Sequence, residues 1–251
     1  SNVIRDSRRA SATLRVILKR QQRHREALFL HAQELFVQGR PADARIVCDR
    51  LIEVAVDPKL TAPPADLGRY YYYLGFLQAA EGDEKAATTA FRRALELSPG
   101  FPPAAIAMAR RHAKRDAMPQ AEALLTGAAR TAMERGQTAE ALLLRRHLAE
   151  LQVQAGNPAA GLAEMRGVIA TGDASAEDRV ALAQMYALDE STRLRAVEEL
   201  RVVLAARPDH LQAMRLLGDL YPVSDGVGRL RVLRALKVIG AARPEETQAI
   251  V

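Results

Sequence analysis

Residues 68–101 read GRYYYYLGFLQAAEGDEKAATTAFRRALELSPGF, and this stretch decides the fold. Apolar residues recur at helical spacing in each half, and the Gly82-Asp83 pair between the halves is typical of a turn. Small residues that permit close helix approach alternate with large ones that fill the remaining space: Leu74, Gly75, Ala87, Phe91 and Ala94. Pro99 ends the second half, because the residue before a proline disfavours helical backbone. The stretch therefore predicts two antiparallel helices joined by a tight turn.

The pattern returns along the chain at steps close to 34 residues, which indicates a repeat architecture. Residues 68–101 resemble the tetratricopeptide (TPR) repeat, although Tyr71 stands where that family has Trp and Gln78 where it has Tyr. The resemblance covers about residues 25–241, with one strong unit and five degenerate ones. It implies an all-α fold, a right-handed α-solenoid of antiparallel helix pairs (a TPR-like superhelix).

The expected organisation is an N-terminal helix followed by a divergent repeat, a linker and further repeats. The ranges are 1–24 for a basic amphipathic helix, 25–58 for the divergent repeat, 59–67 for a Pro-rich linker, and 68–101, 102–141, 142–175, 176–210 and 211–251 for the TPR-like repeats. Residues 242–250 echo residues 206–214, so we expect another first helix to start where the chain stops. Such an end lacks a polar cap, and we expect further chain, a partner or a second copy to cover it.

Composition favours a globular helical protein. The chain has 251 residues, of which 49% are hydrophobic and 26% charged, and it is rich in Ala, Leu and Arg, which form helices readily. No apolar run approaches the ~20 residues needed to span a bilayer. Cys48 is the only cysteine, which excludes an intrachain disulfide, and we expect it in the core.

The sequence contains no pattern typical of catalysis, metal binding or cofactor binding. The five histidines are scattered without metal-ligand spacing, and no serine lies in a G-x-S-x-G turn. Gly226-Val227-Gly228 lacks the third glycine and the preceding strand of a dinucleotide-binding loop. We therefore expect a protein that is not an enzyme, with no catalytic residues, no metal site and no cofactor.

Positive charge is concentrated at the N-terminus. Eight of the 36 basic residues and one of the 30 acidic residues lie within residues 1–25, so the rest of the chain is close to neutral. On a helical wheel of residues 8–28, one side is apolar: Ala10, Leu14, Ile17 and Leu18. The opposite side is the predicted site for an anionic surface: Arg8, Arg9, Arg15, Lys19, Arg20 and Arg23. No Gly or Pro occurs before Gly39, so we expect this helix to continue into the first repeat.

Three readings of this basic face remain open. The first is that it is the solvated side of a helix that caps the solenoid. The second is that it lies against the cytoplasmic side of a membrane. The third is that it contacts nucleic acid or an acidic protein. Near anionic lipid, each basic residue gains about 1 kcal/mol. Residues 1–28 contain no aromatic side chain on which a base could stack, which disfavours RNA.

The TPR resemblance also implies a binding surface. In that family the first helix of each repeat lines the concave face, where peptides commonly bind. The corresponding groove residues are Phe29, Gln33, Phe36, Tyr72, Phe76, Ile106 and Arg110. An aromatic floor beside an arginine suits an extended or helical peptide with apolar anchors. The alternative is that these aromatic rings pack between neighbouring helices. The positions that clamp a C-terminal carboxylate in some TPR domains hold Phe29, Gln33, Tyr73 and Pro103, which do not fit that role.

The sequence therefore predicts a non-catalytic TPR-like scaffold that mediates protein–protein interaction through its concave groove. The alternative is a membrane-associated assembly subunit of a bacterial secretion or exopolysaccharide machine, anchored through its N-terminal end. We expect the partner to be a protein or peptide, and not nucleic acid. In the alternative, the partner is an anionic membrane surface. If copies of the chain meet at the uncapped end, we expect a homo-oligomer. The expected location is the cytoplasm, or the cytoplasmic face of the inner membrane in the alternative.

Overall fold

The computed structural model describes residues 13–14, 16–59, 61–221 and 226–238. In this part of the chain every regular element is a helix and no strand occurs, which confirms the expected all-α class. The chain forms two compact units, residues 1–141 (unit 1) and 142–251 (unit 2), each with its own buried clusters.

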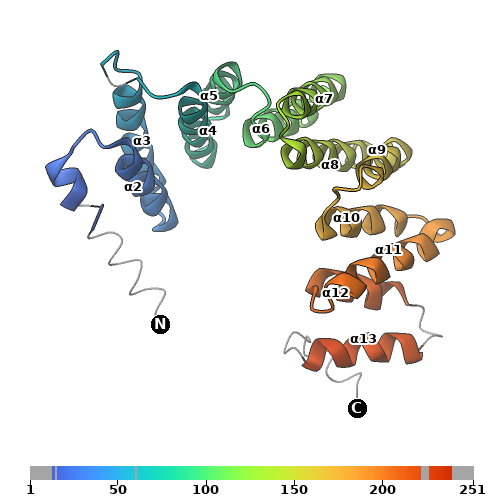
Figure 1. The fold of residues 1–251 in the computed structure, drawn as a ribbon. Helices are drawn as coiled ribbons and strands as arrows, with labels where there is room; N and C mark the ends of the chain where they lie inside the picture. Colours follow the sequence, from blue (N-terminus) through green and yellow to red (C-terminus); the bar gives the residue numbers. More distant parts are fainter. Residues whose placement is uncertain (1–12, 15, 60, 222–225, 239–251) are drawn as a thin grey trace. The chain divides into compact units, whose positions relative to one another are not determined.

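Unit 1 is built from consecutive helix pairs, drawn from blue to green in Figure 1. The helices are α2 (Arg25–Val37), α3 (Pro41–Ala55), α4 (Pro64–Ala80), α5 (Glu84–Leu97), α6 (Pro102–Ala113) and α7 (Met118–Glu134). Each second helix packs against the first helix of its own pair, and α3 and α5 also pack against the first helix of the next pair. The predicted array of antiparallel helix pairs is confirmed in this unit.

The turn between α4 and α5 is formed by a glycine with positive φ and an aspartate that caps the next helix. Gly82 has a φ of 86°, a conformation that glycine adopts far more readily than other residues. Asp83 then caps α5, because its carboxylate accepts a hydrogen bond from the Ala86 amide at 2.9 Å. The Gly-Asp pair therefore ends one helix and starts the next, as its sequence indicates.

Close contact between α4 and α5 depends on Gly75. A Cβ atom at this position would lie 2.9 Å from the Phe91 ring and 3.1 Å from the Ala87 carbonyl oxygen. Phe91 is 2% exposed and fills the space beside the glycine. The small-and-large pattern of residues 68–101 is thus the packing pattern of this helix pair.

The basic N-terminal helix does not continue into α2, contrary to the prediction. Residues 16–20 are helical, residues 21–24 form a turn, and α2 begins at Arg25. His24 has extended backbone, and its Nδ1 accepts a hydrogen bond from the Ala27 amide at 3.2 Å. The imidazole thereby satisfies one of the free amides at the start of α2. Histidine is not among the usual capping residues, so this break could not be predicted from the residue types.

The connection between α3 and α4 is shorter than expected. Helix α4 begins at Pro64, within the 59–67 stretch expected to be a linker. The Ala62 amide donates a hydrogen bond to the Ala55 carbonyl oxygen at 2.9 Å, and Ala62 is 2% exposed. Proline is favourable at the first position of a helix, where the amide has no partner. The proline that suggested a linker therefore starts the helix.

Unit 2 continues the pairing. Its helices are α8 (Thr138–Gln154), which begins just before the unit boundary, α9 (Pro158–Ala170), α10 (Ala176–Tyr186), α11 (Arg193–Ala206), α12 (Leu211–Leu220) and α13 (Gly226–Val238). A 3-10 turn, Glu190–Thr192, precedes α11 where the sequence has one residue more than the repeat requires. The core is centred on Met165, Leu182 and Leu200. The further helix expected at residues 242–250 lies outside the described residues.

A buried carboxylate ties α8 to α10 in unit 2. Asp178 is 4% exposed and accepts hydrogen bonds from the Ser175 amide at 2.9 Å and the Ser175 hydroxyl at 2.8 Å. Arg146 of α8 donates to the same carboxylate at 3.0 Å. Ser175 in turn accepts from the Asp178 amide at 3.1 Å, which completes a capping box at the start of α10.

Cys48 lies in the core of unit 1, as predicted. Its side chain is fully buried, and its Sγ is 3.8 Å from the Tyr70 carbonyl oxygen. Burial raises the pKa of the thiol to about 12, with a smaller contribution from Asp49. Because the thiolate is the reactive form, this cysteine is chemically inert in the folded protein.

Candidate functional site

Aromatic side chains join α2 to α4 in unit 1. The Phe29 ring lies 5.3 Å from Tyr70 and 5.4 Å from Tyr73, measured between ring centroids. Phe29 is 7% exposed and lies beneath the surface. Phe36 meets Phe76 edge-on at 4.9 Å. Tilted and edge-to-face rings at these distances attract one another, so the rings hold α2 beside α4.

Next to these rings, α2 and α4 present large apolar side chains to solvent. Leu30 is 42% exposed, Val37 is 85% exposed and Phe76 is 37% exposed. Phe36 and Tyr73 are half-buried beside them, and Phe76 stacks on Tyr73 at 5.9 Å. These five residues are named the apolar surface: Leu30, Phe36, Val37, Tyr73 and Phe76.

The apolar surface includes three residues that the sequence prediction missed. Leu30 and Val37 are seven residues apart and flank the half-buried Gln33 on one side of α2. The signal available in the sequence was that Leu30 and Val37, both apolar, lie on the side of α2 opposite its buried side. The Tyr73 hydroxyl donates a hydrogen bond to the Ala32 carbonyl oxygen at 3.3 Å, and burial raises its pKa to about 12.

Tyr72, one turn before Phe76 on α4, lies against α5 and α6. Its ring centroid is 5.6 Å from that of Phe91 and 5.7 Å from that of Phe101. Burial raises the pKa of its hydroxyl, and the Arg110 charge partly opposes this. On α6, Arg110 is exposed and Ile106 is half-buried. Tyr72 therefore joins the second pair to the third, whereas Phe76 faces the first.

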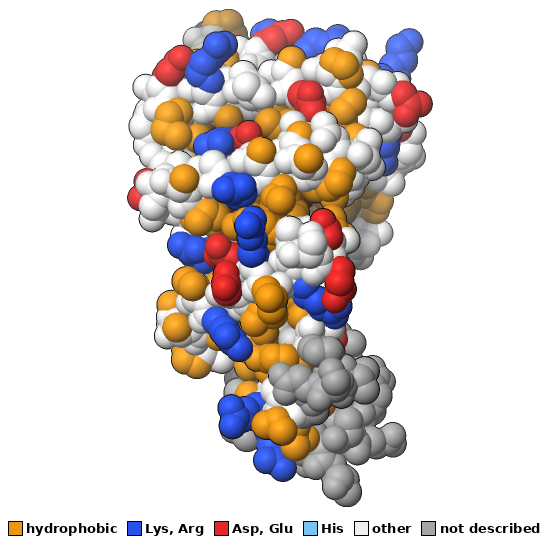
Figure 2. Space-filling view, turned by 90° about the vertical axis from the view of Figure 1, so that its right-hand side faces the viewer, with side chains coloured by type: hydrophobic (Ala, Val, Ile, Leu, Met, Phe, Trp, Pro, Cys, Tyr) orange, Lys and Arg blue, Asp and Glu red, His pale blue; other side chains and the backbone are white. Residues whose placement is uncertain are grey.

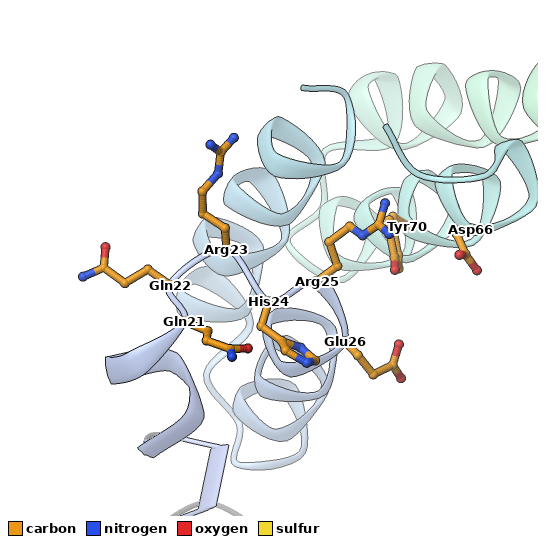
Figure 3. Close-up of a pocket in the computed structure, with 8 residues that line it drawn as sticks. All are labelled: Gln21, Gln22, Arg23, His24, Arg25, Glu26, Asp66 and Tyr70. Carbon is orange, nitrogen blue, oxygen red and sulfur yellow. The ribbon is translucent and has the colours of Figure 1, made fainter. Parts of the chain in front are cut away.

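A polar recess of about 600 Å³ opens where residues 21–24 meet α2 and α4 (Figure 3). Arg25 reaches toward Tyr70, whereas Arg23 points away. Glu26 and Asp66 also line the recess, and both approach the Arg69 guanidinium, at 3.5 Å and 3.6 Å. Charges of both signs line this recess, so it has no marked preference for an anion or a cation.

The predicted basic site is described only in part, because Arg8, Arg9 and Arg15 lie outside the described residues. Lys19 and Arg20 are exposed, and Arg23 forms an ion pair with Asp57. One further cation, on α3, lies close to this segment: Arg50 donates to the Gln22 side chain at 3.4 Å.

Elsewhere charge is mixed. On the face drawn in Figure 2, basic and acidic side chains are interspersed, with apolar side chains between them. Among the described residues no cluster of His, Cys, Asp and Glu has the arrangement needed to hold a metal ion. Within the same residues, no helix combines the length and apolar character required to cross a membrane.

No protein-family model and no curated protein matches the chain. Many solved structures share its fold. PilW, described as a widely conserved type IV pilus biogenesis factor, aligns with a TM-score of 0.63 and 11% identity over 90% of this chain and 98% of its own. A tetratricopeptide repeat protein from Parabacteroides merdae ATCC 43184 aligns with a TM-score of 0.60 and 12% identity over 95% of this chain and 89% of its own.

A larger protein contains the same fold. A chain of the APC/C hetero-tetramer Cut9–Hcn1 aligns with a TM-score of 0.55 and 12% identity over 97% of this chain, which spans 45% of the length of that chain. Identities this low establish the fold alone. They confirm the TPR-like fold that residues 68–101 indicate.

Proposed function

We propose that this TPR-like chain is a non-catalytic scaffold that binds a segment of another protein on the face formed by α2, α4 and α6. The observation that carries the proposal is the apolar surface of α2 and α4, where Leu30, Val37 and Phe76 are exposed. In the TPR family, which the chain resembles, this face is the concave side of the solenoid. A bound segment places its apolar side chains on Phe76 and its neighbours, and Arg110 on α6 offers a charge at the edge.

The energetics favour this face as a protein-binding site. Contiguous apolar surface on a soluble protein marks interaction sites, and covering it gains about 25 cal/mol per Å². The rings of Phe36, Tyr73 and Phe76 support one another at 4.9 Å and 5.9 Å, so they lose little freedom on binding. Two proteins with the same fold support a protein partner for this chain, because one is named a pilus biogenesis factor and the other belongs to a hetero-tetramer.

Replacing Phe76 with glutamate is expected to remove the partner, because a carboxylate replaces the ring at the centre of the apolar surface. The experiment is quantitative co-purification from cells that express the tagged wild type or the variant. Leu194→Glu is the matched control, because Leu194 is 78% exposed on α11 of unit 2. Proteins recovered equally with wild type and Phe76→Glu would refute binding at this face.

A second candidate is the membrane-associated assembly subunit, held at the cytoplasmic face of the inner membrane through its N-terminal end. The observation that favours it is the proximity of Arg50 on α3 to the segment with Lys19 and Arg20, since Arg50 donates to the Gln22 side chain. These cations lie on two elements, so they present a wider basic surface than one helix. A role in bacterial secretion or exopolysaccharide export belongs to this candidate.

The Lys19→Glu/Arg20→Glu variant is expected to lose binding to vesicles that contain anionic lipid, since each basic residue near such a surface contributes about 1 kcal/mol. Co-sedimentation with anionic and neutral vesicles measures this. The control is Lys114→Glu/Arg115→Glu, which makes the same charge change at two exposed positions that follow α6. Equal, negligible sedimentation of the wild type with both vesicle types would eliminate this candidate.

A further inference from the structure

An open groove runs between α4 and α5 in unit 1, with a volume of about 640 Å³. Its α4 wall consists of Tyr71, Leu74 and Gln78, which share one side of that helix. At about 3.6 residues per turn, these three lie roughly 150° around α4 from Phe76. The groove is therefore on the side of α4 opposite the apolar surface, and it is named the α4–α5 groove.

Small residues of α5 form the floor of the α4–α5 groove. Ala86 and Ala90 both line it, and Ala90 is 6% exposed in the same buried cluster as Leu74. The three pairs of unit 1 align through small buried residues: Ala32 and Ala44, Gly75 and Ala87, and Ala109 and Ala121. In this alignment Val47 and Leu124 take the place of Ala90. The small side chain of Ala90 thus leaves space that a larger residue takes in the neighbouring pairs.

The α5 edge of the groove is mainly cationic. Three cations line it, Lys85, Arg92 and Arg93, against two carboxylates, Asp83 and Glu96. Arg93 pairs with Glu96 at 2.8 Å, and the Asp83 carboxylate caps α5. No described residue forms an ion pair or a hydrogen bond with the side chain of Lys85 or Arg92. These two side chains are therefore available for an anionic partner.

The fold explains neither of these two cations. Lys85 lies in the first turn of α5, where a positive charge opposes the helix dipole. Both side chains are exposed, so they contribute little to packing. At the places of Lys85 and Arg92, the first pair has Ala42 and Asp49, and the third pair has Pro119 and Thr126. The repeat therefore does not require them, and charge complementarity favours an acidic partner.

We propose that the α4–α5 groove binds a short extended segment of another protein, in which apolar residues alternate with acidic ones. Its walls run about 10 Å from Tyr71 to Gln78 and about 16 Å from Lys85 to Glu96. Extended chain rises about 3.3 Å per residue and points successive side chains to opposite sides, so about three to five residues fit. The apolar side chains rest on the alanine floor, and the carboxylates meet Lys85 and Arg92.

Fluorescence anisotropy of a labelled peptide tests this site in the full chain, at about 0.15 M salt to screen distant charges. The probe is Glu-Glu-Leu-Glu-Leu-Glu-Glu, and the same peptide with lysine for glutamate should bind at least about tenfold more weakly. Lys85→Glu/Arg92→Glu should weaken the glutamate peptide at least about tenfold, because both attractive charges are reversed. The control, Lys114→Glu/Arg115→Glu, makes the same charge change at exposed positions outside the groove. Equal affinity of these two variants would overturn the proposal.

A substitution that leaves the charge unchanged tests the recess itself. Thr89→Trp places a large ring at an exposed position that lines the groove, so it should also weaken binding of the glutamate peptide at least about tenfold. Thr126→Trp is the matched control, because Thr126 is exposed on α7 and lies outside the groove. If both tryptophan variants bound the peptide equally, the recess would not be its site.

Three further results would overturn the proposal. The first is the absence of saturable binding of the glutamate peptide to the wild type. The second is that Phe76→Glu weakens binding as much as Lys85→Glu/Arg92→Glu does, which would place the peptide on the apolar surface. The third is tighter binding of a single-stranded oligonucleotide than of the peptide, lost in Lys85→Glu/Arg92→Glu, which would make the groove a nucleic-acid site.

Discussion

Phe91→Ala is expected to destabilise unit 1 by about 4 kcal/mol, the range observed when a large buried aromatic side chain is truncated. The ring is 2% exposed, lies 5.6 Å from the Tyr72 ring and carries the Arg111 guanidinium 4.5 Å above its face. The cavity cannot close easily, because Gly75 already brings the α4 backbone against α5. Hydrogen exchange resolved by peptide measures the loss in α4 and α5 separately from unit 2.

Phe76→Ala is the matched control for this prediction. It makes the same chemical change on the facing helix, but Phe76 is 37% exposed and its removal leaves no enclosed cavity. We expect a smaller loss of about 1–2 kcal/mol, because the ring is partly exposed but also contacts Phe36 at 4.9 Å and Tyr73 at 5.9 Å. If both variants lost the same stability, Phe91 would not be the packing residue of this helix pair.

Arg146→Met is expected to destabilise unit 2 by about 3 kcal/mol, because it leaves the buried Asp178 carboxylate without its ion-pair partner. Asp178 keeps its hydrogen bonds from Ser175, but the only charge that approaches it in the described contacts is the Arg146 guanidinium at 3.0 Å. Methionine retains most of the alkyl chain, so the loss reports the charge. The measurement is again hydrogen exchange, read in α8 and α10.

Arg207→Met serves as the control for the buried pair. Arg207 pairs with Glu177 at 3.1 Å, but both side chains are more than half exposed. Exposed pairs contribute at most about 1 kcal/mol, so unit 2 should keep nearly all its stability. A similar loss in both arginine variants would show that burial of Asp178 is not the cause.

The helix pairs were predictable from the sequence because their signals are local. Gly82, Asp83 and Gly75 act on residues within one turn or one helix pair, and each acts in the structure as its type indicates. The break before α2 was not predictable by the same rules, because His24 caps the helix through Nδ1 and no Gly or Pro marks the place. The Arg146–Asp178 pair was missed because 32 residues separate its members.

For the candidate site, periodicity predicts the side of a helix but not the neighbour that covers it. Phe29 and Phe36 are seven residues apart on α2, yet Phe29 is 7% exposed because Tyr70 and Tyr73 enclose it. Tyr72 and Phe76 share one side of α4, but their rings contact different helix pairs. Contacts of this kind depend on residues from other repeats, which a helical wheel does not include.

The central claim is that the apolar surface of α2 and α4 holds a protein partner. Its most direct measurement is a binding titration of the co-purified partner against wild type, Phe76→Glu and Leu194→Glu. Loss of a central aromatic anchor should weaken binding at least about tenfold, while Leu194→Glu should bind as wild type does. Equal affinity of Phe76→Glu and wild type for that partner would contradict the claim.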